Sequence, residues 1–422
     1  MLDRRTFTLL LGGAVAAPTV AHGRTPGRTA KRRAGGSTVF YSAVGPELSL
    51  YDMNVGEATL AKKSTVSVPA NIQYVWPHPS KPLIYVVSSN RTASFVGDKN
   101  FANAFRIDSA TGTLAPHGAP HVLPSRAIHA CVDKAGEFLL TAFNDPSSLT
   151  VHRINPDGTL GAAVPQPNSL DTGKYAHQIR VTPDNRHVIM VTRGNNAPED
   201  KVVHPGSIKV YGFKGGVLSN AAAIQPGDGM AFGPRHLDFH PTRPWVYVSI
   251  ESQHKLYVYR RDAATGVARE PMFVKETLAA GATPGPRQHS GAIHVHPNGR
   301  FVYLTNRDSG TVDFEGRKVS GGGQNNVAVF AINQATGEPT LIQTADAQGI
   351  EMRTFSIDPS GRLLVAASIR PVAVRDGGAI KTVTAGLSVL RVGSDGRLQL
   401  ARKYDVDVGG ESQWWSGMVT LA

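Results

Sequence analysis

Hydrophobic positions along the chain recur in short runs with a period of two. Residues 256–259 (LYVY) and 326–330 (NVAVF) are two such runs, and turn residues separate each run from the next. Alternation over short stretches is typical of strands, whereas helices show a period of 3.6 over longer stretches. The pattern predicts an all-β chain.

One strand–turn–strand unit recurs six times along the chain. Its turn contains Pro or Gly, and its second strand is rich in Tyr and Val. The six copies begin at residues 78–85 (HPSKPLIY), 133–139 (DKAGEFL), 183–188 (PDNRHV), 240–248 (HPTRPWVYV), 296–303 (HPNGRFVY) and 358–364 (DPSGRLL). Their spacing of about 50–60 residues is close to that of one propeller blade.

Tight hairpin turns give a second, independent count of the repeats. Seven occur, at residues 56–60, 111–114, 157–160, 215–218, 265–267, 336–341 and 395–398. Asp-Gly and Thr-Gly at these points supply residues that tolerate a positive φ in tight β turns. Seven hairpins predict seven blades of four antiparallel strands, packed radially so that their faces are buried.

The mismatch between six units and seven hairpins predicts that one blade is shared between the chain ends. We expect the first strand, residues 38–43, to pair with a C-terminal strand near residues 398–406 and so close the ring. Residues 38–422 then form one seven-bladed β-propeller domain, although the length of 422 residues alone suggests two or three domains.

The N-terminus has the layout of an export signal. Arg4 and Arg5 precede an apolar stretch at residues 9–17, and small residues follow at 19–21. This layout predicts a signal peptide over residues 1–21, cleaved after Ala21, whereas an ordinary amphipathic helix is the alternative. Adjacent arginines favour the twin-arginine route, so we expect the Tat export machinery as a partner and a periplasmic or secreted protein.

The net charge of +12 is concentrated near the N-terminus. Residues 24–33 carry five positive charges and no negative charge, within a predicted basic linker at residues 22–37. Such a run also occurs in nucleic-acid and membrane patches. Because no nucleic-acid recognition motif follows, we predict neither partner. No later apolar run approaches the roughly 20 residues that span a bilayer. The one cysteine, Cys131, lies in a strand pattern and is expected to be a buried thiol.

Unusual polar residues occupy equivalent points of successive repeats. His177 and Arg235 lie near the start of neighbouring units, and Glu251 and Arg307 each follow the second strand of a unit. Radial superposition would bring these four side chains to one place. The alternative for the arginines is a structural bridge between blades, with Glu251 as their ion-pair partner.

Other candidate residues have simpler interpretations. His78, His240 and His296 precede Pro and are expected to cap strands. His294 and His296 alternate on one strand like a metal pair, but a zinc site needs three or four ligands. We therefore predict no metal and no cofactor. The adjacent Trp414 and Trp415 are expected to pack under the closing blade, with a ligand platform as the alternative.

At these residues the chain resembles the seven-bladed propeller lactonase family, which includes 6-phosphogluconolactonases of one bacterial type and the fungal carboxymuconate lactonising enzymes. The resemblance covers about residues 39–400. Its clearest marks are GPRHLDFHP at 233–241, YVSIE at 247–251 and PNGRFVYLTNR at 297–307.

The resemblance implies a lactone site of one histidine, two arginines and one glutamate, which match His177, Arg235, Arg307 and Glu251. The arginines would bind anionic groups, and His177 or Glu251 would act as the base. Extra histidines at 289–294, a Gly-rich loop at 308–324 and the export signal depart from the family pattern. These differences leave open which lactone is the substrate, and whether the enzyme hydrolyses or forms it.

The sequence thus predicts an exported, metal-independent lactonase with a small lactone as its substrate. An unphosphorylated sugar or aromatic-acid lactone suits an exported protein better than a phosphorylated one. Two alternatives are a non-catalytic propeller that binds a ligand or protein, and a quinone-dependent dehydrogenase. A fold does not fix a function, so the first alternative stays open. The second lacks a calcium-site or Trp-rich signature.

Overall fold

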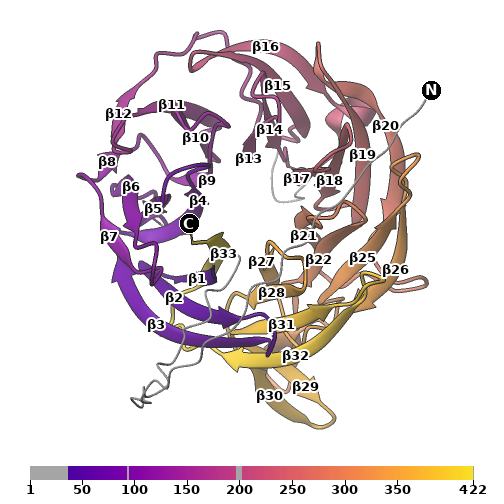
Figure 1. Cartoon of the computed structure of the whole chain (residues 1–422). Coiled ribbons are helices and arrows are strands. Elements are labelled where there is room, and N and C mark those ends of the chain that lie inside the picture. Colours follow the sequence, from indigo (N-terminus) through magenta and orange to yellow (C-terminus); the bar gives the residue numbers. More distant parts are fainter. Residues whose placement is uncertain (1–36, 93–94, 196–201, 422) are drawn as a thin grey trace, which may run out of the picture. The chain divides into compact units, whose positions relative to one another are not determined.

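The computed structural model describes residues 37–92, 95–195 and 202–421, and seven four-stranded antiparallel sheets make up a β-propeller. Figure 1 shows the sheets as blades around one axis, in the order of the sequence. The predictions of an all-β chain and of seven blades are confirmed. The predicted signal peptide and nearly all of the predicted linker lie outside the described residues.

We number the blades in chain order from the first complete one and name strands from the axis outward. Blade 1 contains β4 (Asn71–Pro77), β5 (Leu83–Ser89), β6 (Asn100–Ile107) and β7 (Leu114–Pro116), and β8 (His121–Val122) also pairs with β6. Blade 2 contains β9 (Ala127–Val132), β10 (Phe138–Phe143), β11 (Ser148–Ile154) and β12 (Leu160–Ala163). Blade 3 contains β13 (Ala176–Val181), β14 (His187–Thr192), β15 (Ser207–Lys214) and β16 (Val217–Ile224).

Blade 4 follows the short 3₁₀ helix η1 (Pro226–Gly229) and contains β17 (Pro234–Phe239), β18 (Trp245–Ile250), β19 (Lys255–Asp262) and β20 (Gly266–Glu276). Blade 5 contains β21 (Gln288–Val295), β22 (Phe301–Asp308), β25 (Asn326–Ile332) and β26 (Pro339–Ala345). Blade 6 contains β27 (Met352–Ile357), β28 (Leu363–Ser368), β31 (Gly386–Val392) and β32 (Leu398–Asp405).

Two blades carry an extra hairpin between their second and third strands. In blade 5 it is β23 (Thr311–Phe314) with β24 (Arg317–Ser320), and in blade 6 it is β29 (Val372–Asp376) with β30 (Ala379–Val383). The Gly-rich segment 308–324 therefore forms an arm instead of an irregular loop.

Blade 7 joins the two ends of the described chain, as predicted. Its strands are β33 (Gln413–Thr420) nearest the axis, then β1 (Thr38–Val44), β2 (Glu47–Asn54) and β3 (Thr59–Ser67). The expected partner of the first strand was wrong in detail, because residues 398–405 form β32, the outer strand of blade 6. The sequence pattern did not separate this outer strand from the short strand that follows it.

Six of the seven second strands are buried along their whole length, and β1 except at its two ends, because a blade packs on each of their faces. All residues of β5, β10, β14, β18, β22 and β28 are buried. Each apolar cluster joins neighbouring blades; one contains Trp245 and Tyr247 of blade 4 with Val302 and Phe330 of blade 5. Burial of this apolar surface is the main force that holds the ring together.

Hydrogen bonds between blades fix their spacing. The hydroxyl groups of Tyr41, Tyr85, Tyr247 and Tyr303 each donate to the carbonyl of a glycine in the outer hairpin of the next blade. These four glycines, 112, 158, 337 and 396, belong to the hairpins counted in the sequence. The turn glycines thus have a second role, as acceptors between blades.

The His-Pro histidines, which were expected to cap strands, accept hydrogen bonds from the turn that follows each inner strand and also bridge blades. His240 Nδ1 accepts the backbone N–H of Thr242 and Arg243 in its own turn. Its Nε2 lies 2.8 Å from the carbonyl oxygen of Gly299 in the next blade. His78 and His296 contact Gly136 and Gly361 in the same way. Cys131 is buried, and burial raises the pKa of its thiol to about 12. In the described residues, no helix is long and apolar enough to cross a membrane.

We predict that replacing Gly299 with Ala destabilises the ring much more than replacing Gly316 with Ala. Both glycines have a positive φ, +72° and +74°. A Cβ at Gly299 would lie 2.6 Å from the His240 ring, whereas nothing lies within 4 Å of one at Gly316. The backbone penalty is about 1–2 kcal/mol at either site, and crowding adds roughly 1–3 kcal/mol at Gly299. Urea unfolding of both variants measures the difference; equal losses would contradict the bridging role.

Candidate active site

Each innermost strand of the propeller is interrupted by a β-bulge near its first residues. Pairing skips one residue in six of these strands, namely Gln73, Ile128, His177, Arg235, Arg353 and Trp414, and two residues, Gly291 and Ala292, in β21. A bulge breaks the regular alternation of side chains and redirects the extra one. The repeat-equivalence of His177 and Arg235 that the sequence suggested is therefore real, and it lies at this irregularity.

The ends of the second strands supply a second set of equivalent residues. Arg193, Glu251 and Arg307 occupy the same register position on blades 3, 4 and 5, opposite Tyr175, Gly233 and His289 of the inner strands. The backbone N–H of Glu251 donates to Gly233, as that of Arg193 donates to Tyr175. The same repeat therefore places three charged side chains side by side.

A compact ion cluster results from these two sets of residues. Glu251 Oε2 accepts a hydrogen bond of 2.7 Å from Arg193 Nη1, and Glu251 Oε1 accepts one of 2.6 Å from Arg307 Nη2. Arg235 Nε lies 3.1 Å from the same Oε1. Three of the four predicted residues are therefore in direct contact, and Arg193, which was not predicted, completes the cluster.

The cluster has three guanidinium groups for one carboxylate. Burial alone would raise the pKa of Glu251, but Arg193, Arg307 and Arg235 outweigh burial and hold that pKa well below its usual range. Burial, and then the neighbouring Arg307, lower the pKa of Arg235 to about 9. Glu251 is thus a fixed carboxylate, and the cluster keeps an excess of positive charge.

Arg235 carries unused hydrogen-bond donors in a buried position. Its side chain is 1% exposed, and within the described part of the chain its Nη1 has no hydrogen-bond acceptor, while its Nε lies against Glu251 Oε1 without hydrogen-bond geometry. Leaving a buried charged donor unpaired costs several kcal/mol, or about 1–3 kcal/mol for a neutral one. Such an orphaned group therefore calls for a functional explanation.

His177 lies beside the cluster in a row of aromatic rings. Its ring centroid is 5.1 Å from that of His236, which in turn lies 6.1 Å from His129. Tyr74 packs on His129 at 3.9 Å. The Nδ1 atom of His177 is buried and has no hydrogen-bond partner among the described residues. His177 thus faces the same region as Arg235, although no direct hydrogen bond joins them.

The electrostatic environment keeps these rings neutral. Burial, followed by the charges of Arg235, Arg193 and Arg353, holds the pKa of His177 well below 6.5. Burial and Arg235 do the same for His236. Burial lowers the pKa of His289 to about 4, although Glu251 acts in the opposite direction.

Several residues of this region were not assigned by sequence reasoning. Arg193 follows the strand MVT instead of a Tyr-Val strand, but a strict repeat alignment with Glu251 finds it. His236 belongs to the sequence motif GPRHLDFHP at 233–241. Arg353 is the bulge residue of β27, and His236 directly follows the bulge residue of β17. His289 was noted only as an extra histidine; its position opposite Arg307 depends on strand register.

The suspected metal pair is divided between separate contacts. His294 Nδ1 lies 3.6 Å from Asp238, whereas His296 contacts Gly361 in the next blade. Trp414 and Trp415 are also divided: Trp415 is buried against Tyr74 in a core cluster, and Trp414 occupies the bulge of β33.

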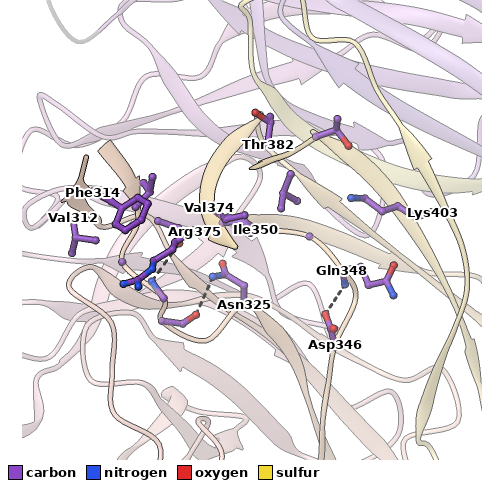
Figure 2. A pocket seen from close by; sticks show the side chains of 18 of the residues that line it. Val312, Phe314, Asn325, Asp346, Gln348, Ile350, Val374, Arg375, Thr382 and Lys403 are labelled. Carbon is purple, nitrogen blue, oxygen red and sulfur yellow. Dashed lines mark hydrogen bonds between the residues drawn. The ribbon is translucent and has the colours of Figure 1, made fainter. Parts of the chain in front are cut away.

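A large hollow of about 1000 Å³ lies between the two extra hairpins (Figure 2). Its walls include Phe314, Ile350 and Val374, and Arg375 stacks over the Phe314 ring at 4.6 Å. None of the four predicted site residues lines it. Asn325 connects the two regions, because it lines the hollow and its Oδ1 accepts the backbone N–H of Asp308, beside Arg307.

Comparison with known proteins gives relatives of one kind. A 6-phosphogluconolactonase of Bacillus subtilis (strain 168) is 24% identical over 344 residues, which cover 79% of this chain and 85% of that protein. Another, from Photorhabdus laumondii subsp. laumondii, is 28% identical over 316 residues, 74% of this chain and 81% of that protein.

Solved structures agree on the fold. A periplasmic gluconolactonase of Pseudomonas aeruginosa gives a TM-score of 0.68 at 18% identity, over 91% of this chain and 99% of that chain. Residues 37–372 match the model of the family described as "Lactonase, 7-bladed beta-propeller". With most of its length matched, and with the blades and closure in place, the chain belongs to the seven-bladed β-propeller lactonase family.

Proposed function

We propose that this protein is an exported lactonase that hydrolyses a sugar-acid or related lactone by side-chain acid–base chemistry, without a metal. The observation that carries the proposal is the buried Arg235 guanidinium, whose unpaired N–H groups lie beside Glu251 and near His177. The names of its relatives, 6-phosphogluconolactonase and gluconolactonase, support a lactone as the substrate.

Arg235 is suited to stabilise the oxyanion of the reaction. Attack on a lactone carbonyl moves negative charge onto its oxygen, and a preorganised buried donor binds that charge without having to reorganise. Because the Nη1 donor of Arg235 has no acceptor in the described residues, it is available to the carbonyl oxygen, while Nε stays paired with Glu251. Arg307 and Arg193 each donate one terminal hydrogen bond to Glu251, and of their buried nitrogen atoms only Nε lacks a partner among the described residues.

Glu251 is better suited to position arginines than to act as the base. Both of its oxygens accept hydrogen bonds from arginine, and its pKa is held well below the ordinary range by those charges. A carboxylate with so low a pKa accepts a proton poorly. We assign it the role of fixing the directions of Arg193, Arg235 and Arg307.

His177 is the stronger candidate for the general base. Its Nδ1 has no partner among the described residues, and its low pKa keeps the ring neutral at pH 7. It would take a proton from water as the water oxygen attacks the carbonyl carbon. The ring C–O bond then breaks, and the proton passes to the leaving oxygen, which gives a hydroxy acid. A base with a low pKa contributes modestly, so about 10²-fold is expected, the low end of the usual range.

Replacing Arg235 with Lys is expected to lower kcat/KM about 10²–10³-fold, the usual effect of losing one oxyanion donor. Arg261→Lys is the matched control, because Arg261 pairs with Asp184 at 2.9 Å on an outer strand. A screen of aldonolactones with both variants and the wild type measures the effect. Hydrolysis unaffected by Arg235→Lys would contradict the oxyanion role, and a wild type inactive on every lactone would favour the non-catalytic ligand-binding alternative.

The pH profile is expected to lack a step near 6.5. Because the folded-state pKa of His177 lies below 6.5, the ring stays neutral as pH falls through 6.5 and becomes protonated only in more acidic solution. The rate kcat/KM should therefore stay level as the pH falls from 8 through 6.5 and drop only in more acidic solution, as the base is protonated. His177→Gln should reduce the rate and abolish the fall in kcat/KM at acidic pH. If that fall is unchanged in this variant, another residue is the base.

Export is testable apart from catalysis. Replacing Arg4 and Arg5 together with Lys is expected to keep the protein in the cytoplasm, because the twin-arginine route reads this pair in a folded cargo. Cell fractionation and immunoblotting measure the distribution. Unchanged export of the double variant would contradict the twin-arginine assignment.

A further inference from the structure

Two arginines near the candidate site lack the carboxylate partner that the others have. Arg193 and Arg307 contact Glu251, and Arg370 lies 3.2 Å from Glu351. Within residues 37–92, 95–195 and 202–421, neither Arg126 nor Arg353 forms an ion pair. The only hydrogen bond of the Arg126 side chain in that part of the chain goes from Nε to Gln73 Oε1, at 2.7 Å.

Both guanidinium groups lie over the ring of Trp414. The Arg353 guanidinium stacks over its ring at 4.2 Å from the centroid, and that of Arg126 lies at 6.0 Å. Arg353 comes from the bulge of β27, Trp414 from the bulge of β33, and Arg126 directly precedes β9. All three side chains are half-buried, so solvent reaches them. The closing of the ring by β33 is what brings them together.

Stacking on Trp414 does not compensate these charges fully. A cation–π contact contributes about 0.5–2 kcal/mol, whereas removing an ion from water costs several kcal/mol. Burial, and then the nearby Arg235 and Arg307, lower the pKa of Arg353 well below its usual value. Burial and Arg91 lower that of Arg126 to about 10. A bound anion would relieve both penalties.

We propose that Arg126, Arg353 and Trp414 form an anion subsite next to the reacting centre, which holds a carboxylate or comparable anionic group of the ligand. This inference rests on the proposed lactonase function, which supplies the reacting centre next to the subsite. The anion has two possible sources: the carboxylate that ring opening creates, or an acidic group that the lactone already carries. Gln73 positions Arg126, and Trp414 positions both arginines.

The subsite is tested with Arg353→Gln and Trp414→Leu in the full mature protein. The control is Arg397→Gln, because Arg397 lies on the outer surface and donates to a backbone carbonyl. Isothermal titration with gluconate and glucarate measures anion binding directly. Steady-state rates are measured on glucono-δ-lactone, which is uncharged, and on glucarolactone, which carries a carboxylate.

A product-carboxylate site predicts about tenfold weaker gluconate binding in both variants, whereas Arg397→Gln should bind gluconate as the wild type does. A substrate-anion site predicts about a tenfold higher KM for glucarolactone alone. Trp414→Phe should restore much of either loss, since an aromatic face remains. Unchanged anion affinity with an unchanged glucarolactone KM, or a wild type that binds neither anion, would overturn the subsite. Arginine-dependent anion binding by a protein inactive on every lactone would support the subsite while rejecting the lactonase function.

Discussion

The hydrogen bonding of β33 to β1 is the constraint on which the rest of the propeller depends. This pairing joins Gln413–Thr420 to Thr38–Val44 and gives the seventh blade its innermost strand. Without it, blade 1 would present an open face where Trp415 and Val39 now lie buried, and blade 6 an open face where Phe40 and Met418 now pack. This pairing also positions Trp414, because Trp414 belongs to β33 and lies beside the other inner-strand side chains only when β33 is paired with β1.

Positive charge gathers in the candidate site, where Arg193, Arg235 and Arg307 surround Glu251. The buried carboxylate of Glu251 is shared among three arginines, with Glu351 3.8 Å from Arg307 as a second, more distant carboxylate, and burial works against the charges of Glu251 and Arg235. The arrangement is tolerated because the packed second strands fix the charged side chains before any ligand arrives. Preorganised charge of this kind favours the negative transition state of ester cleavage, in which an oxyanion replaces a neutral carbonyl. Neutral histidines around it complete a region that attracts anions.

The hairpins of blades 5 and 6 extend the same two blades that carry Arg307 and Arg353. The hollow between them is the largest concavity that we describe, yet it holds none of the predicted residues (Figure 2). Asn325 links its floor to the backbone of Asp308 and Glu351. Extra hairpins such as these change the surroundings of a site, while the blades that carry its charged residues keep their structure.

The sequence by itself determined the blade count, the four-stranded unit and the repeat-equivalence of His177 with Arg235 and of Glu251 with Arg307, because alternation and turn residues are local signals. It did not determine which C-terminal strand closes the ring, since residues 398–405 and 413–420 both look like strands. Only the tertiary structure decided that Glu251 is bound by Arg193, that Trp414 lies under Arg126 and Arg353 while Trp415 is buried, and which donor of Arg235 remains unpaired. These contacts join residues far apart in the chain, and their geometry depends on strand register and bulges, which leave no local mark in the sequence.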